Sequence, residues 1–190
     1  MFASIVNIVR PKEKSFLFDL FCIGAGSLFI ALLAQISIPL WFTPIPLSLQ
    51  TLAVSLIAAT LGSKRGALAI LTYLAEGAVG LPVFAGGVGG IAKLFGTNGG
   101  YLFGFVLAAY IIGLLLEKGW KEKYLLTLAA LYLGSFATLS LGAFWLSFYT
   151  GGVKSALALG VYPFLIGDTI KSILGAGLIL SGRRLTRWIS

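Results

Sequence analysis

The chain of 190 residues contains no histidine and only one cysteine. Without histidine, imidazole-based catalysis, histidine-ligated haem and the usual zinc sites are excluded. The single cysteine, Cys22, cannot form an internal disulfide, and the sequence has no cysteine cluster that could bind a metal. These absences predict that the chain has no metal site. Because the sequence also has no arranged nucleophile and base, we expect that it is not an enzyme, and no cofactor of its own is expected.

Charged residues are also scarce. They make up 11% of the chain, against 58% hydrophobic residues and a mean hydropathy of +1.01. Soluble globular domains carry about 25% charged residues, so this chain has too few charges to cover a soluble surface. We therefore expect an all-α polytopic membrane protein, and the length suits a single domain over residues 1–190.

Six stretches are apolar enough to cross a membrane as helices, which takes about 20 residues. They cover residues 16–38, 47–62, 66–83, 101–117, 124–148 and 155–181. The net charge of +8 comes from basic residues in short runs between these stretches, without a basic helix or an aromatic–basic motif for nucleic acid. No nucleic-acid partner is therefore expected.

The basic runs predict how the chain is oriented. With six spans, Lys93 and Lys154 fall on one side of the membrane, and Lys171 lies within a span. Cytoplasmic loops are enriched in Lys and Arg, so we expect both termini to be cytoplasmic. The other 11 of the 14 basic residues all fall on the side of the two termini. They are Arg10, Lys12, Lys14, Lys64, Arg65, Lys118, Lys121, Lys123, Arg183, Arg184 and Arg187.

Two irregular but apolar segments lie on the opposite, outer side. Three prolines prevent a continuous helix over residues 37–51, and residues 80–101 are rich in glycine. Irregular backbone at membrane depth is tolerated where protein buries it or where it lines a cavity. The two segments therefore predict a lidded pocket that opens outward. The polar groups at its mouth are Gln50, Thr51, Thr97, Asn98 and Tyr101.

An acid and a base lie in the last apolar stretch. Asp168 and Lys171 are three residues apart, and so share one face of a helix. Ionisable residues inside a membrane are costly and are functional candidates by default. In a ligand site, Lys171 would bind a carboxylate and Asp168 would accept N–H donors from an amide- or urea-like group. The alternative is an internal ion pair that only holds the last helix in the bundle.

Glu76 lies within the third stretch, and three roles are open to it. It is a polar group of the pocket, an ion-pair partner of Lys93 or Lys171, or a residue near a flexible helix end.

The string Gly167-Asp168-Thr-Ile-Lys171-Ser resembles the end of a phosphate-binding P-loop but has Ile in place of the glycine before the lysine. The chain therefore has no ATP-hydrolysing machinery of its own.

The first helix carries small residues at three- to four-residue spacing along one face. Small residues let membrane helices approach closely. The face either packs within this bundle or docks another membrane protein, and the spacing does not choose between the two. Its members are Gly24, Ser27, Ala31 and Ala34.

Five strings occur in order over most of the chain. They are Pro44-Ile-Pro-Leu-Ser-Leu-Gln-Thr-Leu-Ala-Val, Leu61-Gly-Ser-Lys-Arg-Gly-Ala, Gly77-Ala-Val-Gly-Leu-Pro-Val-Phe-Ala-Gly-Gly, Gly99-Gly-Tyr-Leu-Phe-Gly-Phe and Tyr162-Pro-Phe-Leu-Ile-Gly-Asp-x-x-Lys. Together they resemble the BioY family, the biotin-specific substrate-binding (S) components of energy-coupling-factor (ECF) transporters. The resemblance implies a six-helix protein of the bacterial plasma membrane that captures biotin from outside.

The resemblance also implies partners and a binding site. The family passes biotin inward by docking on a transmembrane coupling protein driven by two ATPase subunits, which here would use Ser27 and Ala31 of the first helix. ATP would act only through those subunits. The residues that we expect to contact biotin are Asp168, Lys171, Tyr101, Gln50, Thr51, Phe84, Asn98, Lys93 and Glu76.

Two positions depart from the family pattern. The pattern has an arginine in the loop before the fourth helix, where this chain has only Lys93, so the partner of the biotin carboxylate is open between Lys93 and Lys171. Glu76 stands where the family pattern has an uncharged residue.

A different class of function is a stand-alone secondary transporter of a small organic acid, with Glu76, Asp168 and Lys171 as a relay. Such transporters often show internal repeats, and none is evident here.

Overall fold

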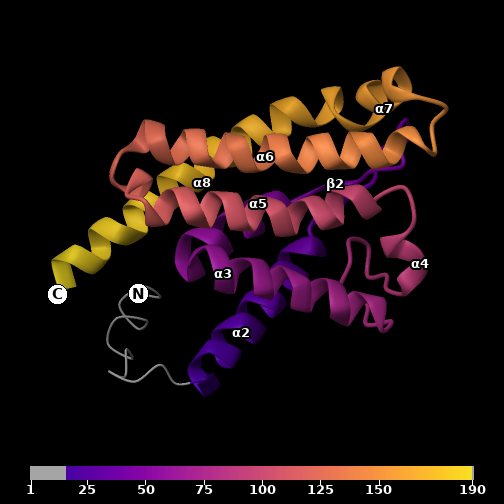
Figure 1. Ribbon diagram of the computed structural model, residues 1–190. Coiled ribbons are helices and arrows are strands. Elements are labelled where there is room, and N and C mark those ends of the chain that lie inside the picture. The colour runs from indigo at the N-terminus through magenta and orange to yellow at the C-terminus, as the bar shows by residue number, and fades with distance from the viewer. Residues whose placement is uncertain (1–15, 190) are drawn as a thin grey trace.

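The computed structural model describes residues 16–189, with side chains up to Arg183. Its helices are α2 (Phe16–Ala34), α3 (Gln50–Ala78), α4 (Ile91–Leu94), α5 (Gly99–Glu117), α6 (Tyr124–Ser147), α7 (Val153–Gly160), α8 (Tyr162–Ile189) and the 3₁₀ turn η1 (Trp120–Glu122). Two short strands, β1 (Ser37–Ile38) and β2 (Leu47–Ser48), form an antiparallel pair. Figure 1 shows the long helices as one bundle, with α5 between α3 and α6.

Five helices in the described part are long and apolar enough to cross a membrane, which agrees with the predicted helical membrane protein. Their outward faces are hydrophobic, as lipid contact requires. On α8, for example, Ile166 and Ile170 are exposed while Asp168 is buried. The five are Phe16–Ala34, Gln50–Ala78, Gly99–Glu117, Tyr124–Ser147 and Tyr162–Arg183.

The longest of these helices, α3, reverses direction at Gly62. Gly62 has φ 81°, a left-handed conformation that favours glycine, and it separates helical segments over residues 50–61 and 63–78. Gln50 Nε2 donates a hydrogen bond to Tyr73 Oη at 2.8 Å, although a straight helix would hold these residues roughly 35 Å apart. The two segments therefore form a helical hairpin, and its arms overlap the predicted stretches 47–62 and 66–83.

A carboxylate holds this turn in place. Glu117, at the end of α5, accepts hydrogen bonds from the Ser63 backbone N–H at 2.7 Å and from Ser63 Oγ at 2.8 Å. A Cβ at Gly62 would lie 2.2 Å from the Glu117 carboxylate, so a larger residue would displace that carboxylate from the turn. The turn of α3 is thus fixed to the end of α5.

The last predicted span, 155–181, was wrong as a single helix. The structure has α7 and α8 with Val161 between them, at φ −122° and ψ −62°. Pro163 has no backbone N–H and disfavours helical geometry in the residue before it. It can therefore begin α8 but cannot continue α7. The break places α7 beside α6 and lets α8 start a new direction.

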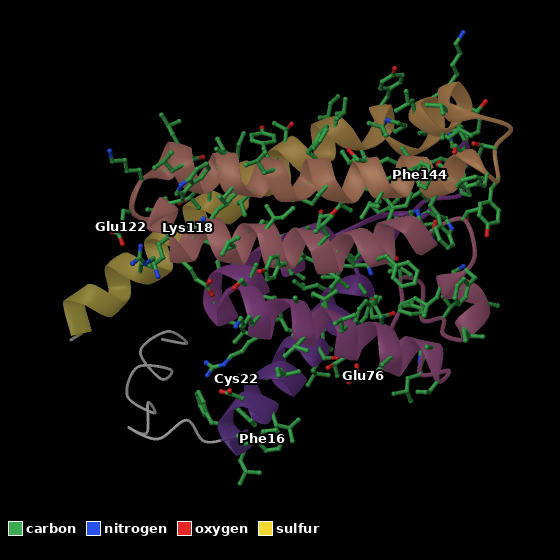
Figure 2. The ribbon with its side chains drawn as sticks, in the orientation of Figure 1. Phe16, Cys22, Glu76, Lys118, Glu122 and Phe144 are labelled. Carbon is green, nitrogen blue, oxygen red and sulfur yellow. The ribbon has the colours of Figure 1, made fainter. Side chains whose placement is uncertain are left out.

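Polar contacts gather the helix ends into two groups. At one end, Arg65 pairs with Asp19 at 2.5 Å and joins the α3 turn to the start of α2. At the same end, Arg183 pairs with Glu122 at 2.9 Å and joins α8 to η1. Figure 2 shows Lys118 and Glu122 at this end. Of the predicted basic runs, Arg10, Lys12 and Lys14 lie outside the described residues.

The opposite end carries the two irregular segments that the prolines and glycines predicted. The β1–β2 pairing holds the first segment, residues 37–51, as a closed loop. Thr43 Oγ1 within this segment donates a hydrogen bond to the Leu159 carbonyl of α7 at 2.6 Å. Gln35, just after α2, donates from Nε2 to the Val83 and Phe84 carbonyls of the second segment at 3.3 and 3.4 Å. Both segments are thereby folded onto the helices.

Candidate functional site

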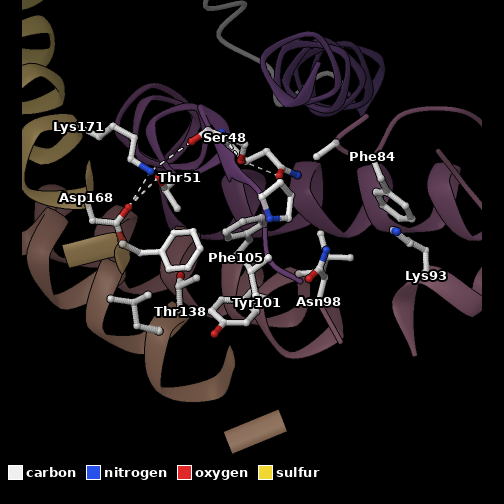
Figure 3. Close-up of a pocket in the computed structure, with 17 residues that line it drawn as sticks. Ser48, Thr51, Phe84, Lys93, Asn98, Tyr101, Phe105, Thr138, Asp168 and Lys171 are labelled. Carbon is white, nitrogen blue, oxygen red and sulfur yellow. Dashed lines mark hydrogen bonds and ion pairs between the residues drawn. The ribbon is translucent and has the colours of Figure 1, made fainter. Parts of the chain in front are cut away.

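A cavity of about 70 Å³ lies where the two irregular segments meet α3, α5, α6 and α8 (Figure 3). Eight of its 17 lining residues are apolar, and the other nine carry polar groups. Apolar surface combined with polar groups that fix the orientation of a ligand is a feature of small-molecule sites. Eight of the nine predicted contact residues line it: Gln50, Thr51, Phe84, Lys93, Asn98, Tyr101, Asp168 and Lys171. The fold thus brings together residues that lie more than 120 positions apart in the chain.

The predicted acid–base pair is formed and buried. Lys171 Nζ lies 2.8 Å from Asp168 Oδ1, and the two side chains are 12% and 7% exposed. Lys171 also donates a hydrogen bond to the Ser48 carbonyl at 3.2 Å. Thr51 Oγ1 donates to Asp168 Oδ1 at 3.3 Å. The pair carries no net charge, yet it offers a hydrogen-bond donor and an acceptor side by side.

Gln50 lines the cavity and also holds its wall together. Its amide nitrogen donates to Tyr73 Oη, and its amide oxygen accepts a hydrogen bond from Ser48 Oγ at 2.9 Å. Gln50 is 5% exposed. The side chain therefore links β2 to both arms of the α3 hairpin, close to the carbonyl that Lys171 contacts.

The far end of the cavity has a different character. Lys93 of α4 and Asn98, just before α5, lie across the cavity from Asp168 and Lys171, with Phe105 between them in Figure 3. Within the described residues no carboxylate lies at ion-pair distance from Lys93, and the buried Asn98 Oδ1 has no hydrogen-bond partner. A buried polar atom without a partner is costly, so this end suits a polar ligand group.

Aromatic side chains form the walls between the two ends. Phe84 is 2% exposed and packs edge-on against Tyr73, with ring centroids 5.4 Å apart. Tyr101, 7% exposed, donates from its hydroxyl to the Gly160 carbonyl of α7 at 2.8 Å. Because that hydroxyl is already used within the protein, Tyr101 offers a ligand mainly its ring.

Glu76 is the predicted contact residue that does not line the cavity. Its carboxylate accepts a hydrogen bond from Ser27 Oγ of α2 at 2.5 Å, and Figure 2 shows it on the α3 side of the bundle, away from α8. The structure forms no ion pair between Glu76 and either Lys93 or Lys171 in the described part of the chain. Of the three roles open to it, an ion pair with either lysine is therefore wrong.

The predicted docking face on α2 disagrees with the structure. Ser27 is fully buried and Ala31 is 8% exposed, because both side chains pack inward. A Cβ on the neighbouring Gly26 would lie 2.9 Å from Ala69 of α3. The small residues thus allow α2 and α3 to pack closely, and a partner could not reach Ser27 in this arrangement. The spacing of small residues in the sequence did not distinguish packing within the bundle from docking of a partner protein.

Sequence reasoning missed several polar residues of the site. Ser48 contributes through its backbone carbonyl, which no side-chain pattern reveals. Thr138 of α6 lines the cavity, and Ser135, one turn before it, donates to Asp168 Oδ2 at 2.6 Å. Hydroxyl residues are ordinary in membrane helices, so only the packing of α6 against α8 identifies these two.

Comparisons with known proteins agree on one family. The model of the BioY family matches residues 10–188. The biotin transporter BioY of Thermotoga maritima is 45% identical over 162 residues, which cover 85% of this chain and 94% of that protein. BioY2 of Lactococcus lactis, also named a biotin transporter, is 40% identical over 85% of this chain and 88% of that protein.

A solved structure shares the fold. The S-component for biotin from an ECF-type ABC transporter superposes with a TM-score of 0.81 at 30% sequence identity, over 88% of this chain and 92% of that one.

Proposed function

The chain belongs to the BioY family, and we propose on that premise that its cavity captures biotin for import across the plasma membrane. It is a multi-pass membrane protein that works as the substrate-specific component of an ECF transporter. The observation that carries the proposal is the division of the cavity into two polar ends with an aromatic wall between them. Biotin has the same division, with a ureido group at one end, a carboxylate at the other and apolar atoms between.

The ureido group suits the Asp168–Lys171 end. It has N–H donors for the Asp168 carboxylate and a carbonyl acceptor for the Lys171 ammonium. Because the two side chains neutralise each other at 2.8 Å, a neutral group that donates and accepts is a better match there than an anion. Thr51 lies at the same end of the cavity.

The carboxylate suits the opposite end. Lys93 has no acidic partner among the described residues, so a ligand anion would balance its charge. Asn98 adds an amide whose buried oxygen has no donor, and the oxygen and nitrogen of such an amide can exchange places by a flip. This assignment chooses Lys93 over Lys171 for the carboxylate. Phe84 and Tyr101 would then pack against the rings and the chain of biotin.

Replacing Lys93 by Ala is expected to lower biotin affinity about tenfold, because a charge-assisted contact with the carboxylate is lost. Biotin methyl ester lacks the anion, so its affinity should be the same for the wild type and the variant. Competition against labelled biotin measures both. Lys154→Ala serves as the matched control, since Lys154 is the other lysine at this end and lies outside the cavity lining. An equal loss for biotin and its ester would contradict the assignment.

The topology that fits this function has six spans with both termini cytoplasmic. The α3 hairpin at Gly62 supports it, because its two arms then cross the membrane separately. The charge distribution supports it too, since few basic residues mark an outer side. Apart from Lys171 within the cavity, Lys93 and Lys154 are the basic residues that the described part has at the end of the bundle with the irregular segments. The opposite end of the described part has Lys64, Arg65, Lys118, Lys121, Lys123 and Arg183.

Cysteine labelling tests the topology. In a Cys22→Ser background, Trp41→Cys should react with a membrane-impermeant maleimide in intact cells, since Trp41 is 96% exposed at the cavity end. Lys123→Cys should react only after the cells are permeabilised. Labelling of Lys123→Cys in intact cells would show that the orientation is inverted.

The partners that this function requires are a transmembrane coupling protein and two ATPase subunits. The chain lacks a P-loop of its own, so hydrolysis of ATP has to occur on those subunits. We include in the proposal that the chain makes and breaks no covalent bond and needs no cofactor. The stand-alone relay is not favoured, because Glu76 bonds to Ser27 and is not joined to the Asp168–Lys171 pair.

Uptake of labelled biotin tests the proposed function. Cells that lack their own importer should accumulate biotin when they express this chain together with its partner subunits. A substitution that stops ATP hydrolysis in the partner ATPases should abolish that uptake. Uptake driven by a proton gradient in vesicles without any ATPase would instead support the stand-alone transporter.

A further inference from the structure

Ser135 of α6 contacts the Asp168 carboxylate from outside the main cavity. It is absent from the lining of that cavity, but it lines a second, smaller one of about 10 Å³ that shares Asp168 and Lys171 with the first. The second cavity has further hydroxyls, from Thr51, Ser55, Thr138 and Ser172, and of these Thr51 and Thr138 also line the main cavity. Ser135 therefore contacts Asp168 without lining the main cavity itself.

The two oxygens of Asp168 have different partners. Oδ1 contacts Lys171 Nζ at 2.8 Å and accepts from Thr51 Oγ1 at 3.3 Å, and both of these residues line the main cavity. Oδ2 accepts from Ser135 Oγ at 2.6 Å. The carboxylate is thus held from two directions, with Lys171 and Thr51 on Oδ1 and Ser135 of α6 on Oδ2.

This arrangement matters because a carboxylate has rotational freedom. Asp168 sits on α8 and Ser135 on α6, so their hydrogen bond fixes the orientation of the carboxylate relative to a second helix. Without the hydroxyl, Oδ2 would face a small buried space with no donor from α6. A charged group in that situation either rotates to another donor or is left poorly solvated. Rotation of the carboxylate would change the position of Oδ1 beside Lys171.

We propose that Ser135 is a positioning residue for biotin capture, which acts by holding the Asp168 carboxylate toward the ligand. It does not touch the ligand itself. The proposal rests on the proposed function, in which Asp168 accepts N–H donors from the ureido group. Ser135 adds a residue of α6 that the cavity lining alone does not include.

Binding of labelled biotin to purified variants tests this. Ser135→Ala should weaken binding about tenfold, because a hydrogen bond to a charged group is lost, and Ser135→Thr should restore most of it because the hydroxyl is kept. Ser172→Ala is the matched control: it removes a hydroxyl from the same small cavity and should bind as the wild type does. Ser135→Cys, which keeps the volume with only a weak donor, replaces the alanine variant if that variant does not fold.

A double-mutant cycle separates positioning from general damage. In an Asp168→Asn background, Ser135→Ala should cause little further loss, since the group that it positions has changed. Equal losses in Ser135→Ala and Ser172→Ala, or additive losses in the cycle, would overturn the role of Ser135 and leave biotin capture standing. Unchanged binding by Asp168→Asn would overturn both.

Discussion

Asp168→Asn and Lys171→Ala should each lower biotin affinity roughly 100-fold or more, because each removes one half of a buried donor–acceptor pair. The pair is 2.8 Å apart and almost fully enclosed. Asparagine at 168 replaces one of the two acceptor oxygens with an NH2 donor and removes the negative charge, and alanine at 171 leaves the aspartate without its counter-charge. Saturation binding of labelled biotin to the purified variants measures the loss.

Two controls separate binding from folding. Asp19→Asn removes a carboxylate that pairs with Arg65 at the opposite end of the bundle, and it should leave affinity unchanged. The double variant Asp168→Asn/Lys171→Met removes both charges together, so its melting temperature should exceed that of Lys171→Ala. Its affinity for biotin should be at least as low as that of the single variants. Recovery of binding in that double variant would show that the pair only holds α8 in the bundle.

Gly142→Val should weaken biotin binding tenfold or more, about the effect of overpacking a well-filled interior. Tyr101 sits in a slot between α6 and α7, and a Cβ at Gly142 would lie 2.2 Å from its ring. The ring cannot stay in place once a side chain is added. Displacing it breaks the hydrogen bond from its hydroxyl to the Gly160 carbonyl and alters the wall of the cavity. Calorimetric or labelled-biotin titration measures the effect.

Gly177→Val is the matched control for this change. Gly177 lies on α8, and a Cβ there would meet no atom within 4 Å, so the substitution adds the same side chain in open space. It should bind biotin as the wild type does. Gly142→Val with full affinity would contradict the placement of Tyr101 in the cavity wall.

Much of the site could be predicted because membrane burial makes polar residues conspicuous. Asp168 and Lys171 were identified by the cost of two charges within one apolar stretch. The irregular segments were identified because prolines and glycines interrupt chain that is still apolar. Both inferences depend on local sequence alone, and the structure places Asp168, Lys171 and both segments around one cavity.

Other features depend on packing between distant segments. The small residues of α2 predicted a close contact but not its partner, and the structure turns Ser27 toward α3 and Glu76. The hairpin of α3 joined two predicted stretches because Gly62 permits a reversal within a single turn. Ser135 could not be found at all, because its hydroxyl gains its role only where α6 meets α8.

Equilibrium binding of labelled biotin to the purified wild-type chain, with unlabelled competitors, tests the central claim most directly. The account predicts saturable binding with submicromolar or tighter affinity, which biotin itself displaces fully. It predicts weaker competition from biotin methyl ester, which lacks the anion for Lys93, and none from a short fatty acid that has the carboxylate without the ureido group. No saturable binding of biotin, or equal displacement by the fatty acid, would contradict the account.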